Sequence, residues 1–278
     1  MVEKKQTPDL WLGQAVTYTD QYDASLLFPV PRCTKRVEIG VDPDCLPFAG
    51  VDVWHAYEVS WLNTRGKPQV ALARVTIGCN SVALVESKSF KLYLNSFNQS
   101  VFVDWSKVQS TIQRDLTALV QGEVTVELFR VDQGDAMGVS TLPGQCLDQL
   151  DIDVDTYTVD PALLQADASD VVAETWYSHL LKSNCLVTGQ PDWGSILIDY
   201  VGPKIDPAGL LRYLISFRQH DEFHEQCVER VFHDVMTHCQ ASRLTVQACY
   251  TRRGGLDINP LRTTERDVTP QPRRLLRQ

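Results

Sequence analysis

The sequence predicts an α+β protein built from two similar halves, each passing from strands through two helices to a closing strand. Two short matches indicate the repeat: residues 93–97 (YLNSF) resemble residues 213–217 (YLISF), and residues 125–128 (TVEL) resemble residues 245–248 (TVQA). Both pairs are 120 residues apart, and the order of hydrophobic patterns around them also repeats. We therefore expect a duplicated α+β unit.

The first half contains strands at residues 70–77 and 82–85, where the apolar patterns are those of β-structure. By the repeat, residues 86–88 lie at a helix start. A second helix is marked by apolar residues three or four apart that stop at Gly122: Val108, Ile112, Leu116, Leu119 and Val120. Residues 124–131 alternate and form the closing strand.

The second half repeats this order. Residues 196–201 have a strand pattern, and Asp206 followed by Pro207 is a favourable N-cap with proline at the first helical position. That helix is expected to run through about Phe217. A longer helix is marked by apolar residues at every fourth position: Phe223, Cys227, Val231, Val235 and Cys239. Residues 244–251 form the closing strand.

These patterns divide the chain into five parts. Residues 1–50 form an N-terminal extension, residues 51–141 the first repeat, and residues 171–262 the second repeat. Residues 142–170 are acidic, lack a regular pattern and connect the repeats. Residues 263–278 carry Arg and Pro with little apolar periodicity, so a solvated surface tail is expected.

Composition excludes several classes of function. The net charge of -9 argues against a broad nucleic-acid surface, which requires concentrated Lys and Arg. No apolar run approaches the roughly 20 residues of a membrane span, and residues 1–6 lack the apolar core of a signal peptide. The eight cysteines include no Cys-x-x-Cys pair. We expect mostly buried thiols in a reducing cytoplasm, with no nucleic-acid or membrane partner.

Four histidines between residues 220 and 238 raise the question of a metal site. His220 and His224 have the i,i+4 spacing of two ligands on one helix face. No third ligand accompanies them, so no metal is expected.

Cys185 and Asp192 are the first candidate catalytic pair. They lie seven residues apart in a segment (SNCLVTGQPDWG, residues 183–194) that has the pattern of strand and turn. A nucleophile needs a nearby proton donor, and a loop can fold the two side chains together. The alternative interpretation is a structural thiol beside an ordinary Pro-Asp turn.

A second cluster, residues 86–91 (ESKSFK), places Ser87, Lys88 and Lys91 at a predicted helix start. Free backbone N–H groups there favour an anion such as phosphate. The alternative is a capped helix with a solvated lysine face.

Two more clusters carry groups suited to a ligand. His224 and Glu225 precede an apolar helical stripe, and a glutamate accepts two hydrogen bonds from a purine-like base. Residues 252–260 (RRGGLDINP) follow a strand, where Arg253 is able to meet phosphate and Gly254 allows close backbone approach. An exposed helix turn and an ordinary Gly-Gly turn are the alternatives. Neither a Rossmann nor a Walker phosphate motif is present.

In this order, the four clusters resemble the NADPH-dependent 7-cyano-7-deazaguanine reductases, the nitrile reductases of queuosine biosynthesis. Residues 86–93 (ESKSFKLY) are similar to the family signature Glu-Ser-Lys-Ser-apolar-Lys-apolar-aromatic. Residues 185–195 (CLVTGQPDWGS) are similar to its cysteine segment, and residues 26–32 (LLFPVPR) to the N-terminal region of the long, two-repeat subfamily. The resemblance spans nearly the whole chain.

The resemblance implies two tandem tunnelling-fold (T-fold) repeats, with antiparallel sheets, helices packed on one side, and repeats that associate into a barrel. It also implies a homodimer with sites at repeat or subunit interfaces. NADPH is the implied cofactor, 7-cyano-7-deazaguanine the implied substrate, and no metal is implied.

The chemistry implied by the resemblance begins with Cys185, which would add to the nitrile carbon and form a covalent thioimide. Asp192, kept protonated by burial, would give a proton to the nitrile nitrogen, and His224 would assist proton transfer or position the substrate. Two NADPH-dependent reductions would yield 7-aminomethyl-7-deazaguanine.

The resemblance further implies the binding residues. The deazaguanine would contact Val85, Glu86, Ser87, His224 and Glu225. NADPH would be held by Ser87, Lys88, Arg253 and Gly254.

Two other functions remain open from the residues alone. A cyclohydrolase-like metal hydrolase on the same fold would bind zinc and act without NADPH. A non-catalytic purine- or pterin-binding protein would bind its ligand without depending on Cys185.

Overall fold

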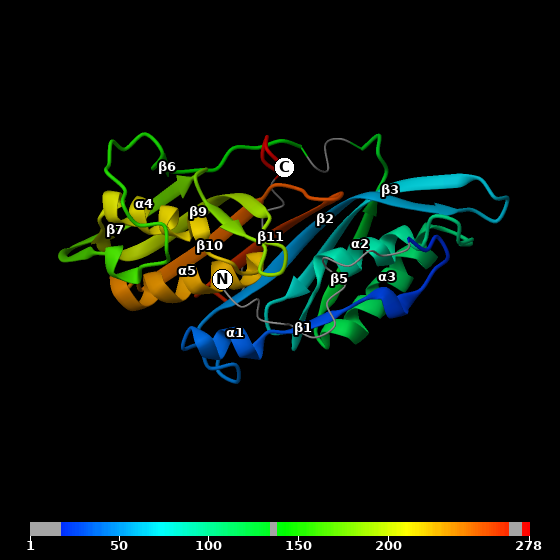
Figure 1. Cartoon of the computed structure of the whole chain (residues 1–278), viewed down its shortest axis with the longest axis horizontal. Helices are drawn as coiled ribbons and strands as arrows, with labels where there is room; N and C mark the ends of the chain where they lie inside the picture. Colours follow the sequence, from blue (N-terminus) through cyan, green and yellow to red (C-terminus); the bar gives the residue numbers. More distant parts are fainter. Residues whose placement is uncertain (1–17, 134–137, 267–273) are drawn as a thin grey trace, which may run out of the picture.

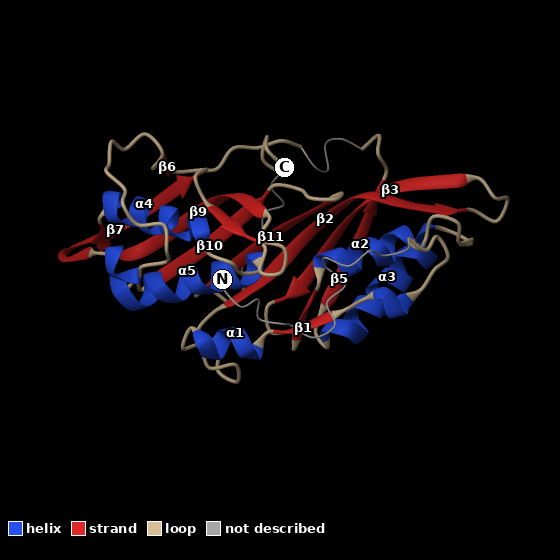
Figure 2. Ribbon diagram, viewed as in Figure 1, coloured by secondary structure: helices blue, strands red, loops and turns tan. Residues whose placement is uncertain are grey.

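Two helix-covered halves share one large sheet, as the computed structural model shows (Figures 1 and 2). The structure describes residues 18–133, 138–266 and 274–278. Within these ranges the sheet has nine strands in the order β5-β3-β2-β11-β10-β9-β7-β6, with β8 paired to β9. Its neighbours are antiparallel except β6 and β7. The predicted α+β class with helices on one side is confirmed.

The first half consists of three long strands of the large sheet, a separate two-stranded ribbon and three helices. The sheet strands are β2 (Ala49–Leu62), β3 (Pro68–Gly78) and β5 (Val124–Phe129). The ribbon pairs β1 (Pro29–Pro31) with β4 (Ala83–Val85), and the helices are α1 (Cys33–Glu38), α2 (Ser87–Asn95) and α3 (Trp105–Val120). Helix α3 ends because Gln121 adopts a left-handed conformation with φ of 50°.

The second half has the same plan. Its strands are β6 (Gln145–Cys146), β7 (Ala166–Ser178), β8 (Lys182–Asn184), β9 (Pro191–Ile205) and β10 (Arg243–Tyr250). Its helices are α4 (Pro207–Ser216) and α5 (His224–Cys239). Asp206 caps α4 as predicted, since its carboxylate accepts hydrogen bonds from the N–H groups of Ala208 and Gly209.

Strand β11 (Leu256–Thr263) joins the halves by pairing with β2 on one side and β10 on the other. The sequence patterns predicted neither β11 nor β2. Both strands carry buried polar side chains, including Asp52, His55 and Asp257, which interrupt the apolar pattern. Pro260 also lies inside β11, where proline is uncommon.

Each half packs its helices over its own part of the sheet and forms a separate hydrophobic core. In the first core Phe90 and Tyr93 of α2 meet Ile112 and Leu116 of α3 over strands β2, β3 and β5. In the second, α4 and α5 pack on β9 and β10. Figure 1 shows α2 and α3 over one half of the sheet and α4 and α5 over the other.

The C-terminal segment differs from the solvated tail that was expected. Residues 274–278 lie against the sheet, with Leu275 and Gln278 buried, while residues 267–273 lie outside the described residues. Leu275 packs with Leu142 and Cys249 in a small cluster. The expected connection also contains β6 and the start of β7.

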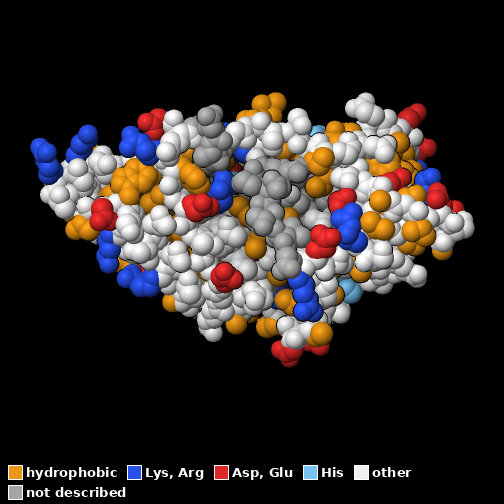
Figure 3. All heavy atoms as spheres, turned by 180° about the vertical axis from the view of Figure 1, so that it is seen from behind, with side chains coloured by type: hydrophobic (Ala, Val, Ile, Leu, Met, Phe, Trp, Pro, Cys, Tyr) orange, Lys and Arg blue, Asp and Glu red, His pale blue; other side chains and the backbone are white. Residues whose placement is uncertain are grey.

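The rear face of the molecule mixes charges of both signs (Figure 3). Lys and Arg side chains lie singly or in small groups, separated by Asp, Glu and uncharged residues. None of the described helices is long and apolar enough to cross a membrane.

Candidate active site

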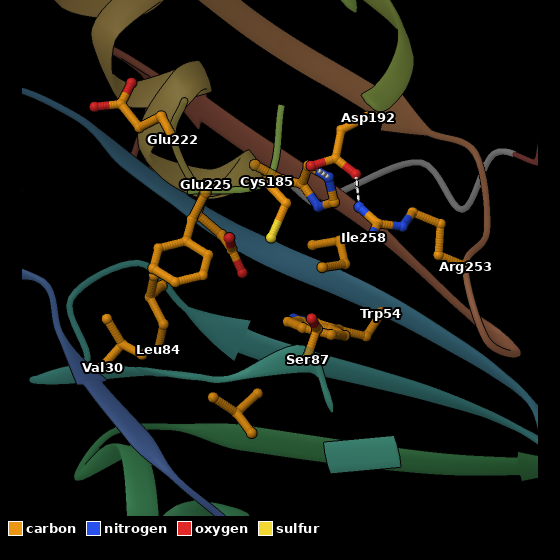
Figure 4. Close-up of a pocket in the computed structure, with 13 residues that line it drawn as sticks. Val30, Trp54, Leu84, Ser87, Cys185, Asp192, Glu222, Glu225, Arg253 and Ile258 are labelled. Carbon is orange, nitrogen blue, oxygen red and sulfur yellow. Dashed lines mark hydrogen bonds and ion pairs between the residues drawn. The ribbon is translucent and has the colours of Figure 1, made fainter. Parts of the chain in front are cut away.

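A pocket lies where the two halves meet, and it collects residues from widely separated parts of the chain (Figure 4). The first half contributes Val30, Trp54, Leu84, Val85 and Ser87. The second half contributes Cys185, Asp192, Glu222, Phe223, His224, Glu225, Arg253 and Ile258. Most of the predicted site residues therefore surround one space.

Cys185 and Asp192 are brought together by the hairpin between β8 and β9. Ser183 pairs with Asp192 across the two strands, and the loop closes when the N–H of Cys185 donates to the carbonyl of Gln190 at 2.9 Å. Gly189 permits this turn because its φ is 66°. In Figure 4 the sulfur of Cys185 points into the pocket beside the carboxylate of Glu225. Cys185 and Asp192 therefore line one pocket, as their seven-residue spacing allows.

Asp192 is buried and ion-paired. Its Oδ2 lies 3.3 Å from Nε2 of His224, and its Oδ1 contacts the guanidinium of Arg253. Burial acts to raise the pKa of Asp192, but His224 and Arg253 outweigh it and hold the pKa below the ordinary 3.8. The expectation that burial keeps this carboxyl protonated is wrong for this structure, because His224 and Arg253 stabilise the carboxylate.

His224 begins helix α5 and is held from two sides. Its ring stacks on Tyr250 with centroids 3.9 Å apart and an interplanar angle of 28°. Its contact with Asp192 is an ion pair without hydrogen-bond alignment, since the buried Nε2 has no hydrogen-bond partner.

Glu225 lies one residue further along α5 and its side chain points into the pocket (Figure 4). Burial raises its pKa to about 8, and the nearby carboxylate of Asp52 adds to the effect. Asp52 belongs to a buried cluster below the pocket, in which Arg262 contacts both Asp52 and Glu229.

Glu86 takes a different position from the one expected of a ligand-facing group. It caps α2, accepting hydrogen bonds from the N–H groups of Lys88 at 2.9 Å and Ser89 at 2.7 Å. It is buried and is not among the residues that line the pocket. The helix start at residues 86–88 is confirmed, but these two N–H groups are occupied by the chain itself and do not await an anion.

A second pocket continues from the first and has the character of a cofactor groove. The two share Ser87, His224, Arg253 and Ile258. The groove adds Lys88, Lys91 and Gly254, so cationic side chains border it. Gly254 has a φ of 57°, a conformation that favours glycine, and a Cβ atom there would stand 2.6 Å from Nζ of Lys91. These residues suit the phosphates of a dinucleotide.

Arg253 is less available than the sequence suggested. Its guanidinium contacts Asp192 and also the side-chain oxygen of Gln190. Arg253 therefore lies between the pocket and the groove, where its side chain would contact a ligand in either space.

The predicted site residues do not include six of the lining residues: Val30, Trp54, Leu84, Glu222, Phe223 and Ile258. Trp54 and Ile258 lie on β2 and β11, whose strand patterns are hidden by buried polar residues. Leu84 belongs to a predicted strand but gave no functional signal. Glu222 is buried beside Arg230 at 2.8 Å and His220 at 2.9 Å, and despite burial these partners lower its pKa to about 2. The sequence feature that could have indicated Glu222 is its position in a loop, two residues after His220.

The paired histidines serve carboxylates in this structure. His220 contacts Glu222, and His224 contacts Asp192. Across the described residues no group of three His, Cys, Asp or Glu side chains is arranged to hold a metal ion.

Known proteins match both halves of the chain. The family model "Nitrile reductase, 7-cyano-7-deazaguanine-reductase N-term" matches residues 18–128, and the model "QueF-like protein" matches residues 191–269. A crystal structure of the archaeosine synthase QueF-Like in the apo form covers 36% of this chain and 96% of its own, with 14% identity and a TM-score of 0.30.

Two curated relatives match nearly their whole length. The NADPH-dependent 7-cyano-7-deazaguanine reductase of Azoarcus sp. (strain BH72) is 57% identical over 92% of this chain and 91% of its own. The protein of the same name from Chromobacterium violaceum is 57% identical over 91% of this chain and 90% of its own. These likenesses cover more than nine-tenths of the chain, and the chain therefore belongs to the NADPH-dependent 7-cyano-7-deazaguanine reductases, a family of oxidoreductases.

Proposed function

We propose that this protein reduces the nitrile of 7-cyano-7-deazaguanine to 7-aminomethyl-7-deazaguanine, with NADPH as reductant, through a covalent thioimide on Cys185. Family membership supports the reaction. The single observation that supports the covalent route is the placement of Cys185, Asp192 and Glu225 around one pocket. A thiol, a proton carrier and a base-binding carboxyl are the three groups that this route requires.

The first step adds the Cys185 sulfur to the nitrile carbon. Because Asp192 is ionised by its partners, we infer that it first accepts the thiol proton and then donates it to the nitrile nitrogen. The S–C bond forms, one π bond of the C≡N group breaks, and the proton moves from sulfur to nitrogen. Asp192 returns to the carboxylate form and no external acid is consumed.

Two reductions follow on the same carbon. NADPH, when bound, supplies a hydride for each of them. After the first, collapse of the tetrahedral carbon releases the Cys185 thiolate and leaves an imine, which the second converts to the amine. We propose that His224 delivers or stabilises protons at the nitrogen, since it lies against Asp192 and its ring is fixed by Tyr250.

The substrate base is proposed to rest between apolar side chains and one carboxyl. Trp54, Phe223 and Ile258 offer apolar surface for the planar ring, and Glu225 faces its hydrogen-bonding edge. Glu86 acts from below by fixing the start of α2, so that Val85 and Ser87 border the pocket.

The groove beside the pocket is proposed to hold NADPH. Ser87 and Arg253 lie at the shared border, and Lys88 and Gly254 lie further out. NADPH held in this groove would supply its hydride across the border that Ser87 and Arg253 form with the Cys185 pocket.

We further propose a homodimer in the cytoplasm, without nucleic-acid or membrane partners. Strand β5 pairs only with β3 among the described residues, so its other edge is available to a second copy. All eight cysteines are free thiols, which suits a reducing compartment.

Mass spectrometry of the intact protein with 7-cyano-7-deazaguanine, in the absence of NADPH, tests the covalent route. The wild type should gain the full mass of the substrate and lose it when NADPH is added, and Cys185→Ala should gain nothing. Substrate binding without an adduct on the wild type would favour a binding protein. Turnover that needs zinc and no NADPH would favour the metal hydrolase.

A further inference from the structure

The C-terminal segment, residues 274–278, contacts the backs of the strands that carry the catalytic groups. Gln278 is 4% exposed, whereas Leu276 in the same segment is 88% exposed. A long polar side chain is seldom buried unless its hydrogen bonds are satisfied. The partners of Gln278 therefore show what the segment does.

Gln278 bridges two strands at the point where their pairing stops. Strands β10 and β11 are paired from Thr245 to Gln247 and then diverge. Beyond that point Nε2 of Gln278 donates to the carbonyl of Tyr250 on β10 at 3.0 Å and to Oδ1 of Asn259 on β11 at 2.5 Å. One side-chain amide thus links the strands where the backbone ladder has opened.

The gap that Gln278 bridges lies at the root of the loop of residues 251–255. This loop connects β10 to β11 and carries Arg253, the partner of Asp192. Tyr250, whose carbonyl accepts from Gln278, is also the residue on which His224 stacks. Two contacts of the catalytic carboxylate, one direct and one through His224, therefore depend on the position of this root.

Arg277 holds the third strand. Its Nη2 donates to the carbonyl of Gly194 on β9 at 2.7 Å, to the carbonyl of His179 at 2.9 Å and to Oγ of Ser195 at 3.3 Å. Gly194 pairs with Tyr250 and lies two residues after Asp192. Arg277 and Gln278 thus hold the two members of one cross-strand pair.

Hydrogen bonds within the C-terminal segment set the position of the Gln278 side chain. The N–H of Leu275 donates to Oε1 of Gln278 at 2.9 Å, and the N–H of Gln278 donates to the carbonyl of Leu275 at 3.0 Å. Leu275 is buried in the cluster with Leu142 and Cys249. These contacts within the segment fix the orientation of the Gln278 side-chain amide toward the strands.

We propose that Gln278, assisted by Arg277, is a positioning residue for the active site: it clamps β10 to β11 so that Arg253 and the His224–Tyr250 stack are held against Asp192. The inference rests on the proposed function only for the identity of the reaction, because the geometry concerns Asp192 and its partners.

The first test compares Gln278→Ala and Arg277→Gln with Leu276→Ala, the matched control from the same segment. At saturating substrate the rate of adduct formation on Cys185 should fall about tenfold in Gln278→Ala, the loss expected from one well-placed hydrogen-bond group. Because Asp192 loses a fixed cation, the acid limb of the pH profile should move to higher pH. Leu276→Ala should match the wild type. Rates and pH profiles equal to the control, with only a lower melting temperature, would make Gln278 purely structural and overturn the proposal.

A second readout does not use the reaction. Iodoacetamide labelling of Cys185, followed by peptide mass spectrometry at one pH, should be faster in Gln278→Ala than in Leu276→Ala, because the Cys185 hairpin, which Arg253 contacts at Gln190 and Asp192, is held less firmly. An unchanged labelling rate would also overturn the proposal, whether or not the wild type reduces the nitrile. A wild type that labels normally but forms no adduct would instead overturn the proposed function. Arg277→Gln alters an exposed side chain and replaces Gln278→Ala if that variant does not fold. It should show the same changes in adduct formation, acid limb and Cys185 labelling, each smaller in size. Their absence in Arg277→Gln would overturn the proposal.

Discussion

Nε2 of His224 lies 3.3 Å from Oδ2 of Asp192, and the guanidinium of Arg253 contacts the other carboxylate oxygen. Burial is the largest single influence on the pKa of Asp192 and acts upward, but His224 and Arg253 together outweigh it. Asp192 is therefore held as a carboxylate, the form that the proposed proton transfer from Cys185 requires.

The first prediction concerns this pair. Asp192→Asn should lower the rate of adduct formation on Cys185 by about 10²–10⁴-fold, the usual effect of losing a general acid–base group, while substrate binding persists. His224→Gln removes one group that lowers the pKa of Asp192, so the acid limb of the rate profile should move to higher pH. Mass spectrometry of samples quenched at set times, from pH 4 to 8, measures both effects. His238→Gln, at an exposed position on the same helix, is the control, and a shift of equal size there would refute the assignment.

Glu225 predicts a pH-dependent stability. Its pKa is raised from the ordinary 4.5 to about 8 by burial and by Asp52. The folded state therefore holds this proton more tightly than the unfolded state, and the resulting stability is complete below pH 4.5 and is lost as the pH rises through 8. The melting temperature of Glu225→Gln relative to wild type should rise steadily between these values. A difference that stays constant from pH 5 to 9 would contradict the raised pKa.

Glu86 and Asp206 allow a matched test, because both residues cap a helix at equivalent positions of the two repeats. Replacing either by alanine should cost about 1 kcal/mol of unfolding free energy. Only Glu86→Ala should also lower kcat/KM, since α2 carries Ser87 and Lys88 beside the pocket. Urea unfolding and steady-state kinetics give the two quantities. Equal activity losses in both variants would mean that the effect is general destabilisation.

The buried ion cluster beneath the pocket predicts a large loss of stability. Glu229 accepts hydrogen bonds from Arg36 at 2.7 Å and from Arg262 at 2.9 Å, and all three side chains are buried. Glu229→Ala leaves two buried guanidinium groups without this partner and should cost about 3–5 kcal/mol. Glu127→Ala breaks the half-exposed pair with Arg74 and should cost less than about 1 kcal/mol. Comparable losses in urea unfolding would show that the buried cluster is not a major source of stability.

Much of the fold was predictable because the local periodicity of apolar residues indicates helices and strands. The stripes of α3 and α5 and the Asp206 cap each depend on residues close in sequence. Strands β2 and β11 were not predictable in the same way. Their buried polar residues satisfy one another across strands about 200 positions apart, as His55 and Asp257 do at 2.8 Å, and no local pattern records such a pairing.

The candidate site divides along the same line. The hairpin that joins Cys185 to Asp192 is local, so the seven-residue spacing indicated it. The position of Glu86 as a helix cap, the contact of Arg253 with Asp192 and the bridge made by Gln278 involve choices between competing partners. A sequence names the candidates but not which partner each one takes.

The sequence by itself determined the duplicated α+β plan and the apolar faces of the long helices, and it named candidate reactive residues, because spacing along one chain fixes which side chains share a helix face or a hairpin. The tertiary structure decided the charge of Asp192, the raised pKa of Glu225 and the burial of the C-terminal segment. These properties depend on desolvation and on ion pairs between distant segments, and both forces act only once the two halves have packed together.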